Sequence, residues 1–552
     1  MKLRVKSKQL TIGILSVLTV NLLQAYFTPI SEDEAYYWIW SQRPDWGYFD
    51  HPPMVAWWIA AGYTIFQNEL GLRLLTVLLN AIALFFVWDI LKPQTPKQSR
   101  LFWISVGSLV VFQVFGFLTT PDAPLLFFTL FYLWTLYRFI HETKPGHSLL
   151  LGLAMTGLLY SKYHGILVIG FTLLPMLPKF YRNKQLYFSI VFGIMLYLPH
   201  IVWLLVHDFV PIRYHFYERS SDEVFEWRKF FNYLGMYFLG AAPLLSYFII
   251  RSIVHFRSKD LFRQSIWCLA VFPGIFFFFS IFKDNVQPQW LLVGFIAMVF
   301  LFYWEYSQRE NLKAVWALGI AGLFLMLCLR IALVVPSLSP FAQNEKFARH
   351  AGTFQPPNPV FEKYQEASVY HFFHPEESAY VHRTLGNRKS QFDLWGSEEE
   401  LHGKTVSYIS PWTLSFRSFK GYKDRDYYVK TIGDYQTFQL IEVKTLRNLM
   451  AKPGERINLG IEIMNGHDRE IAIGGNSNLQ FSVNYYQEIQ YNILYNPIVE
   501  MSQVMLSPGE ELAIQISFDN IPEPGKYKVC VGVTHPEIGT TYVSNVVVLD
   551  VK

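Results

Sequence analysis

Acidic side chains that could act as a general base stand at the start of the first polar segment. The stretch SEDEAYYWIW, residues 31–40, places Asp33 and Glu34 between an apolar run and a group of aromatic residues. A carboxylate can take the proton of an attacking hydroxyl in group transfer. Ser31 and Glu34 also have the spacing of a capping box, which fixes a helix start. Capping accounts for Ser31 and Glu34 but not for Asp33, for which the alternative to chemistry is the general preference for acids in a first helical turn.

Other polar residues with chemical potential lie between the apolar runs. Asp50 and His51 precede a Pro-Pro pair, and Asp122 follows a proline. Taken alone, the first pair fits a simple turn and Asp122 fits the first turn of a helix. Lys162 fits a lysine that extends along the membrane surface. We expect a belt at the headgroup level to explain most of the aromatic residues at 36–58, with rings that stack on sugars as the alternative.

The elements that must position these residues are apolar and long. Hydrophobic residues make up 52% of the 552 residues and charged residues 16%, against about a quarter charged in soluble domains. Apolar runs of about 17–25 residues are typical of membrane-spanning helices. We predict about eleven spans, near residues 10–28, 70–91, 101–118, 123–140, 148–161, 164–178, 186–206, 230–250, 265–282, 289–304 and 313–335. The first run lacks a small-residue cleavage site, so we expect it to be retained.

Positive charges predict the orientation of these spans. Alternate loops carry about eighteen Lys and Arg residues, against about seven in the intervening loops, and the richer side is normally cytoplasmic. The candidate acids and histidines all fall in the poorer, extracytoplasmic loops. The first of these, residues 29–69, contains an apolar piece that is too short to span and is typical of an interfacial helix. An odd number of spans places the C-terminal region outside.

The chain becomes polar after Pro336. Residues 343–440 combine alternating stretches with a helical candidate, which indicates a small α/β domain. Residues 441–552 contain short alternating strands separated by turns such as PGE and EPGK, the pattern of a β-sandwich. One continuous domain over 343–552 is the alternative.

Several classes of protein are disfavoured. The chain has no P-loop and no Gly-rich dinucleotide fingerprint, so an ATP-driven pump is not expected. Its net charge of +4 is too small to indicate a nucleic-acid partner, and its three cysteines are too far apart for a disulfide framework. Ion-coupled transporters place functional charges inside their spans, where this chain has few.

Together the motifs resemble bacterial members of glycosyltransferase family 39, in the GT-C superfamily. This family includes proteins similar to dolichyl-phosphate-mannose protein mannosyltransferases and to the lipid A aminoarabinose transferase. The motifs that carry the resemblance are DE (33–34), FDHPP (49–53), TTPDAPLLFF (119–128) and LLYSKYHG (158–165). RKSQFDLW, residues 388–395, resembles the periplasmic domain that follows the spans in some members. The resemblance implies a polytopic α-helical membrane protein of GT-C type, with residues 1–335 as its transmembrane transferase domain.

The resemblance also implies an activity. A sugar is transferred from a polyprenyl-phosphate-linked donor to a hydroxyl of an envelope lipid, glycan or protein, outside the bacterial inner membrane. The acceptor attacks the anomeric carbon in a single, inverting displacement. A carboxylate deprotonates the acceptor, and cations take up charge on the departing phosphate.

Residue roles follow from matching the family's motifs. Asp33 is the general base, Glu34 is the second acid of its motif, and Asp122 positions the acceptor or the base. The expected contacts to the donor phosphate are Lys162 and His51, which lie in matched motifs, together with Arg219 and Lys283, which are chosen for their loop positions and charge alone. His51 replaces a lysine of the aminoarabinose transferase, so its contact depends on protonation. Asp50 replaces a glutamate that helps to bind a metal, so a divalent metal is a further possibility, with His207 and His215 as candidate partners.

Two other functions remain open from the sequence. A lipid or glycan flippase or channel would lack transferase activity, and a surface sensor or scaffold would use the β-sandwich to bind a partner. A flippase is expected to carry charge within its spans. The acid-bearing first outer loop favours the transferase.

Overall fold

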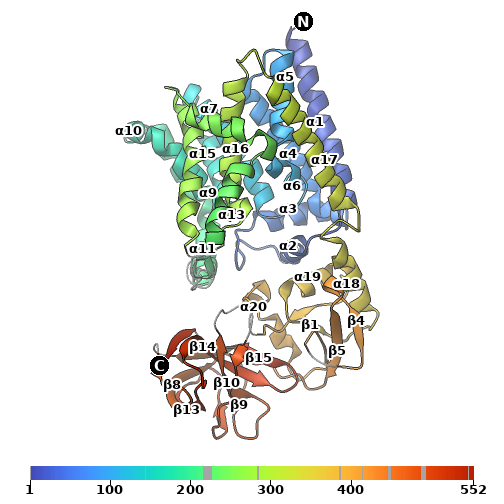
Figure 1. Cartoon of the computed structure of the whole chain (residues 1–552), viewed down its shortest axis with the longest axis vertical. Coiled ribbons are helices and arrows are strands. Elements are labelled where there is room, and N and C mark those ends of the chain that lie inside the picture. The colour runs from blue at the N-terminus through green and yellow to red at the C-terminus, as the bar shows by residue number, and fades with distance from the viewer. Residues whose placement is uncertain are drawn as a thin grey trace. The chain divides into compact units, whose positions relative to one another are not determined.

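The protein consists of two compact units, Met1–Ala342 and Gln343–Lys552 (Figure 1). The computed structural model describes residues 2–142, 144–215, 227–282, 285–384, 387–412, 415–445, 449–486, 493–544 and 546–552. Arg219 and Lys283, which the sequence predicts as site residues, lie outside these described residues. The first unit is helical, and the second combines helices with β-sheets.

Apolar runs form helices in the first unit because a backbone surrounded by lipid must satisfy its own hydrogen bonds. The helices of the bundle are α1 (Lys2–Phe27), α4 (Glu69–Leu91), α5 (Pro96–Gly107), α6 (Val110–Val114), α7 (Asp122–His141), α8 (Pro145–Ser161), α9 (Gly165–Leu173), α10 (Leu177–Phe180), α11 (Lys184–Val206), α12 (Val210–Arg213), α13 (Trp227–Leu239), α14 (Ser246–Val254), α15 (Leu261–Ser280), α16 (Leu292–Tyr306) and α17 (Lys313–Val334). Short 3-10 turns are η1 (Leu174–Met176), η3 (Pro243–Leu245) and η4 (Pro288–Leu291).

All eleven predicted runs fall on helices, but the helices differ in length. Among the described residues, 7 helices are long and apolar enough to cross a membrane: Lys8–Phe27, Glu69–Leu91, Asp122–His141, Lys184–Val206, Leu261–Ser280, Pro288–Tyr306 and Lys313–Val334. The pair Trp227–Leu239 and Pro243–Val254, bent by 83°, raises the number to 8 if it forms one span. The remaining predicted runs lie on shorter helices, so a count of eleven spans stays a prediction.

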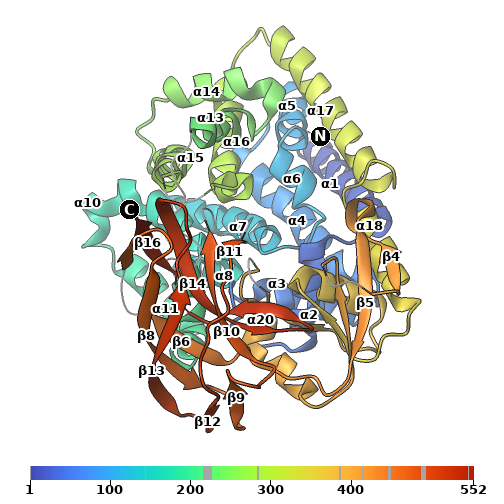
Figure 2. The same ribbon diagram turned by 60° about the horizontal axis from the view of Figure 1, so that its bottom comes forward.

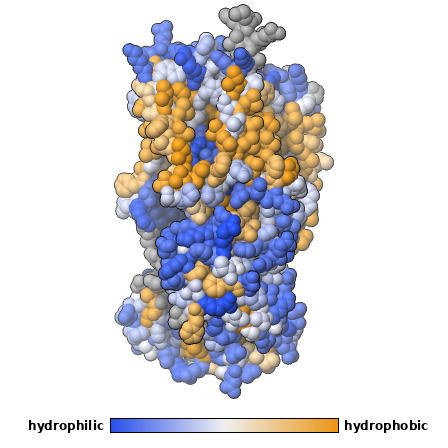
Figure 3. All heavy atoms as spheres, turned by 90° about the vertical axis from the view of Figure 1, so that its right-hand side faces the viewer, coloured by the Kyte–Doolittle hydropathy of each residue, from blue (hydrophilic) through white to orange (hydrophobic). Residues whose placement is uncertain are grey.

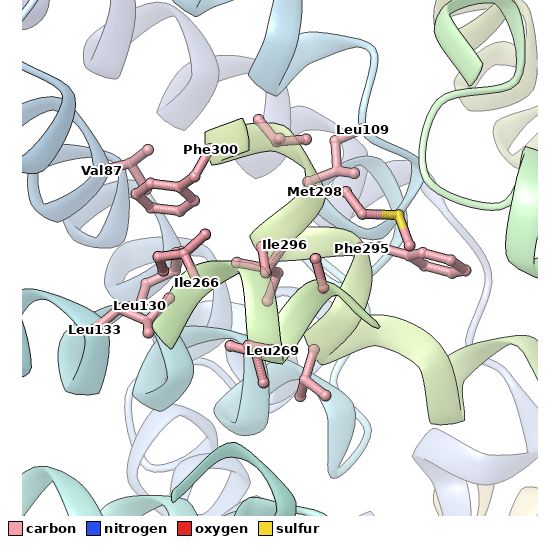
Figure 4. Close-up of a cluster of buried hydrophobic side chains, with 14 of the residues drawn as sticks. Val87, Leu109, Leu130, Leu133, Ile266, Leu269, Phe295, Ile296, Met298 and Phe300 are labelled. Carbon is pink, nitrogen blue, oxygen red and sulfur yellow. The ribbon is translucent and has the colours of Figure 1, made fainter. Parts of the chain in front are cut away.

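The centre of the helical unit is α16, which is apolar on all sides. A helix that is hydrophobic all round is expected to be buried, and nearly every residue of α16 is. Figure 4 shows Phe295, Ile296, Met298 and Phe300 of α16 among side chains of neighbouring helices. By contrast, α1 and α17 expose many large apolar residues, and Figure 3 shows the apolar band that covers this side of the unit.

Two short helices occupy the predicted first outer loop. The helix α2 (Glu32–Gln42) begins at the capping box of Ser31 and Glu34, which confirms that prediction. The helix α3 (Met54–Tyr63) is apolar and too short to span, as predicted, and it packs against α2 and α4. Figure 1 shows α2 lying across the ends of the long helices.

The second unit begins with a mixed sheet. Its strand order is β2-β1-β3-β5-β4, with β1 parallel to β2 and β3, and β5 antiparallel to β3 and β4. The strands are β1 (Pro359–Phe361), β2 (Tyr380–Val381), β3 (Val406–Ser410), β4 (Ser418–Lys420) and β5 (Asp426–Ile432). Helices α18 (Ala342–Gly352), α19 (Tyr364–Phe373) and α20 (Gln391–Trp395) and turns η5 (Ser397–Leu401) and η6 (Tyr422–Asp424) complete this part.

The remaining strands form the predicted β-rich region (Figure 2). One sheet has the order β13-β8-β6, a second has β11-β10-β14-β16-β7 with β15 on β14, and β12 pairs with β9. The strands are β6 (Ile441–Thr445), β7 (Leu449–Ala451), β8 (Arg456–Asn465), β9 (Ile471–Ile473), β10 (Gln480–Tyr486), β11 (Ile493–Tyr495), β12 (Val504–Leu506), β13 (Glu511–Asp519), β14 (Gly525–His535), β15 (Gly539–Tyr542) and β16 (Val547–Val551).

One hydrophobic core runs through the second unit. It includes Val360 and Tyr408 of the mixed sheet together with Ile461 and Val531 of the two larger sheets. Residues along β8 alternate between exposed and buried, as a strand with one solvated face requires. Because the core is continuous, a domain boundary at residue 441 stays a prediction.

Candidate active site

The Glu34 carboxylate is completely buried and fully engaged. Its Oε1 accepts hydrogen bonds from Arg73 Nε at 2.7 Å and from the Thr119 backbone N–H at 2.9 Å. Its Oε2 accepts from Arg73 Nη2 at 2.6 Å and from the Ser31 backbone N–H and hydroxyl at 3.2 and 3.1 Å. These partners come from α4, the segment before α7, and the start of α2. Glu34 therefore joins three segments and has little capacity left for a chemical role.

Arg73 completes this arrangement and was not among the residues predicted from the sequence. It is 0% exposed, and besides Glu34 it donates to the backbone carbonyls of Ala25, Thr28 and Pro29. A single arginine in the apolar run GLRLLTVLL would have been the signal, because a charge buried in a membrane helix requires a partner. The pair fixes the end of α1 and the entry into α2.

Asp33 precedes Glu34 in the first turn of α2 and is exposed. A first-turn carboxylate is stabilised by the helix dipole, which favours its ionised, proton-accepting form. The two acids of the DE motif therefore differ in their surroundings, since Glu34 is buried and Asp33 is exposed.

Asp122 and Lys162 form a second buried ion pair. Asp122 is the first residue of α7, and Lys162 follows the end of α8. The Lys162 ammonium donates to both oxygens of Asp122, at 2.8 and 2.9 Å, and the two side chains are each 7% exposed. No further partner of either side chain is found in the described part of the chain. The structure thus brings together two residues predicted for the site from motifs about forty positions apart.

Asp50 and His51 lie beside His215 and Tyr163. The ring of His51 lies 5.9 Å from that of His215, and His215 Nε2 lies 2.9 Å from the Asp50 carbonyl oxygen. Tyr163, the neighbour of Lys162, lies 6.3 Å from the His215 ring. Burial of the Tyr163 hydroxyl raises its pKa, and Tyr197 and Asp50 raise it further. The FDHPP motif is therefore placed next to the YSKYHG motif.

The loop that carries Asp50 is held against α11. Trp203 Nε1 donates to Asp45 Oδ2 at 2.9 Å, and the His200 ring bonds the Trp46 carbonyl at 2.6 Å. Gly47 lies so close to the Trp203 ring that a Cβ there would be 2.3 Å from it. His207 stacks on Trp203 and bonds its carbonyl. His207 thus packs against the tryptophan that holds this loop.

The aromatic residues of the first outer loop are mostly inside the protein. Trp40 stacks on Tyr48 with 4.5 Å between ring centroids. The buried rings are Tyr36, Tyr37, Trp38, Trp40, Tyr48 and Trp58, whereas Trp46 is 47% exposed. The expected headgroup belt therefore does not describe these six residues. They form part of the buried interior next to the FDHPP motif.

The geometry gives little support for a metal at Asp50. Within the described ranges, no group of three or more His, Cys, Asp or Glu side chains could hold a metal ion. His215 approaches Asp50 through its carbonyl oxygen. We therefore derive no step through a metal.

Part of the chain matches a known family. Residues 50–203 match the family described as dolichyl-phosphate-mannose-protein mannosyltransferase. The chain is 23% identical, over 316 residues, to the lipid A galacturonosyltransferase RgtD of Rhizobium johnstonii. That match covers 53% of this chain and 65% of RgtD, so just under two thirds of that curated relative is spanned.

The fold matches solved structures of ArnT from Cupriavidus metallidurans. The apo structure superposes with a TM-score of 0.56 at 14% identity and covers 77% of this chain and 98% of ArnT. The structure bound to undecaprenyl phosphate gives the same TM-score at 15% identity, covering 76% and 97%. At this identity the likeness concerns the fold, and it confirms the predicted GT-C architecture.

Proposed function

We propose that this chain is a membrane glycosyltransferase that transfers a sugar from a polyprenyl-phosphate-linked donor to a hydroxyl group of an envelope acceptor, in line with its family match over residues 50–203 and its fold likeness to ArnT. The observation that carries the proposal is the meeting of four separate motifs. Glu34 binds the backbone of Thr119, Asp122 binds Lys162, and Tyr163 lies beside the His215 ring that contacts Asp50. A purely structural role would not require an accessible acid beside this network.

Asp33 serves as the base in this proposal. The acceptor oxygen attacks the anomeric carbon while Asp33 takes its proton. The bond between that carbon and the phosphate oxygen breaks, and the polyprenyl phosphate leaves with the electron pair. The exposure of Asp33 supports this role, since the acceptor must reach it. The fixed position of Glu34 holds the first turn of α2 and hence the base.

Cations stabilise the leaving phosphate. Lys162 serves this role because, within the described residues, its ammonium is bound only by the Asp122 carboxylate. A phosphate oxygen shares the ammonium while Asp122 keeps it in place. His51, Arg219 and Lys283 are proposed as further phosphate contacts.

The acceptor remains to be assigned, and the relatives suggest where to begin. RgtD is named for transfer to lipid A. We propose lipid A-type saccharide lipids as the first acceptors to test, with the reaction at the extracytoplasmic face of the inner membrane. A reporter fused after Lys552 is expected to register outside the cytoplasm, and a cytoplasmic signal would contradict an odd number of spans.

The base assignment is tested with purified protein, a polyprenyl-phosphate sugar and lipid A. Asp33→Asn is expected to lower transfer by roughly 10²–10⁴-fold, the usual contribution of a general base. The control is Glu32→Gln, which removes an exposed charge from the same turn. Full transfer by Asp33→Asn would show that the base lies elsewhere. Lipid movement across the bilayer without transfer would favour a flippase.

The phosphate contact at His51 has its own test. His51→Lys supplies a permanent charge, so transfer is expected to stay constant or rise at alkaline pH, where histidine is neutral. A loss of transfer by a folded variant would contradict the contact.

A further inference from the structure

Arg330 is a buried arginine in a helix that faces the membrane. It lies in α17 and is 7% exposed. Its Nε donates to Gln113 Oε1 at 2.6 Å, and its Nη2 donates to Asn21 Oδ1 at 2.8 Å. Both partners are neutral amides. They orient the guanidinium without neutralising its charge.

The charge of Arg330 is not balanced by the protein around it. No carboxylate pairs with Arg330 in the described part of the chain, and its Nη1 is buried without an acceptor. The Phe117 ring lies 5.5 Å from the Arg330 guanidinium and 6.0 Å from that of Arg73. Arg73 is neutralised by Glu34, so one positive charge remains. A buried charge is costly unless a counter-ion accompanies it.

The position of Arg330 suits a lipid headgroup. It lies four residues before the end of α17 at Val334, which is about 6 Å along the helix axis. Anchoring charges near helix ends lie at headgroup depth.

The surfaces on both sides of Arg330 are suited to lipid chains. Leu23 of α1 is 55% exposed, and Leu327 and Ile331 of α17 are each 52% exposed. Gln113 is only partly buried, so the polar cluster is not sealed off. An amphiphile could therefore place its chains along α1 and α17 while its anionic group reaches Arg330.

We propose that Arg330, oriented by Asn21 and Gln113, binds the phosphate group of a membrane lipid between α1 and α17. A guanidinium forms strong, charge-assisted bonds with phosphate. The phosphate belongs either to a phospholipid or to a polyprenyl phosphate. The site shares no residue with the proposed catalytic residues and does not depend on the proposed function.

Native mass spectrometry of the full chain tests the proposal. The probes are dioleoylphosphatidylglycerol, undecaprenyl phosphate and dioleoylglycerol, which has no phosphate. The protein is expected to retain one or both phosphate lipids but not dioleoylglycerol, and the retained probe identifies the source. Arg330→Gln is expected to weaken retention at least roughly tenfold, the loss of one charge-assisted contact. Arg330→Lys keeps the charge and should retain part of the affinity.

The matched control is Arg349→Gln, which removes an exposed arginine from the second unit. Equal retention by Arg330→Gln and the unaltered protein would overturn the proposal. If Arg330→Gln does not fold, a photoreactive phosphatidylglycerol or undecaprenyl phosphate with its label next to the phosphate decides the matter on the unaltered protein. Adducts on peptides of α1 and α17 would support the site, and adducts only elsewhere would overturn it.

Discussion

Among its described residues the helical unit contains two buried ion pairs, and they differ in the number of their partners. Glu34 and Arg73 use every oxygen and every N–H group, and they bind backbone groups of five other residues: Ala25, Thr28, Pro29, Ser31 and Thr119. In the described part of the chain, the side chains of Asp122 and Lys162 bind only each other. A saturated pair is suited to holding a fold, whereas an unsaturated pair retains capacity for a ligand. Within one unit, the Glu34–Arg73 pair is therefore the candidate for stabilising the fold, and the Asp122–Lys162 pair is the candidate for chemistry.

The largest expected effect comes from breaking the saturated pair. Arg73→Gln leaves Glu34 buried without its counter-charge and leaves three carbonyls without donors. Removing one partner of a buried ion pair costs about 3–5 kcal/mol. We expect a strong fall in the yield of monodisperse protein and in the melting temperature. Arg349→Gln is the control for loss of an arginine.

Glu34→Gln is expected to be similarly severe. If Glu34 served only in the capping box, glutamine could replace it with little loss. A stable, active Glu34→Gln protein would show that the ion pair with Arg73 matters less than its burial indicates.

The second prediction replaces both partners of each pair. The double variant Asp122→Leu, Lys162→Met is expected to remain folded, because exchanging a whole buried pair for apolar residues is often neutral. Its transfer rate is expected to fall by roughly 10²–10³-fold, the usual contribution of a group that stabilises developing charge. The double variant Glu34→Leu, Arg73→Leu is expected to unfold, since it leaves backbone groups unsatisfied. Equal stability of the two double variants would contradict the distinction between a pair that holds the fold and a pair that is available to a ligand.

The sequence predicts part of this contrast. The capping box follows from the spacing of Ser31 and Glu34, because its bonds are local. Arg73 lies 39 positions from Glu34, and no local pattern tells which acid a lone arginine will meet. The pairing of Asp122 with Lys162 required the same long-range information. Motif order suggested only that both belong to one site.

The fold shows the same division between local and distant information. Apolar runs predicted the positions of the helices, and alternation predicted β8 and the neighbouring strands, because these patterns express burial on a face. Buried aromatic residues such as Trp40 were assigned to a headgroup belt. Composition alone does not tell whether an aromatic ring faces lipid or another part of the protein.

The third prediction tests the cap against the ion pair. Ser31→Ala removes one acceptor at the start of α2, while Arg73 continues to hold Glu34. We expect a loss of about 1 kcal/mol, the typical value for a helix N-cap, with transfer nearly unchanged. Thermal unfolding and the transfer assay together check this expectation. A loss of stability as large as that of Arg73→Gln would mean that the cap, rather than the ion pair, is the main source of stability at the start of α2.

The smallest effect on stability is expected for a solvent-accessible ion pair. In the second unit, Glu399 Oε2 lies 2.9 Å from His467 Nδ1 in a hydrogen bond and 2.9 Å from Arg469 Nη2 in an ion pair, and its side chain is 25% exposed. Burial tends to raise the pKa of Glu399, but the His467 hydrogen bond and the two positive partners lower it overall. Its stabilisation is therefore present above the unfolded pKa of about 4.3 and is lost as the pH falls through the lower folded value.

Glu399→Gln removes this titration. We expect the variant to lose about 1 kcal/mol or less at pH 7, the usual range for a solvent-accessible pair, and to show a smaller further loss on acidification than the unaltered protein. Hydrogen exchange of peptides covering η5 and the residues after β8, measured at pH 7 and below pH 4 with correction for intrinsic rates, reports the effect locally. If both proteins lose the same protection on acidification, the pair does not contribute. A loss as large as that from Arg73→Gln would mean that exposure to water does not weaken an ion pair of this kind. The difference between the saturated and the unsaturated buried pair would then have to be explained by the number of their partners alone.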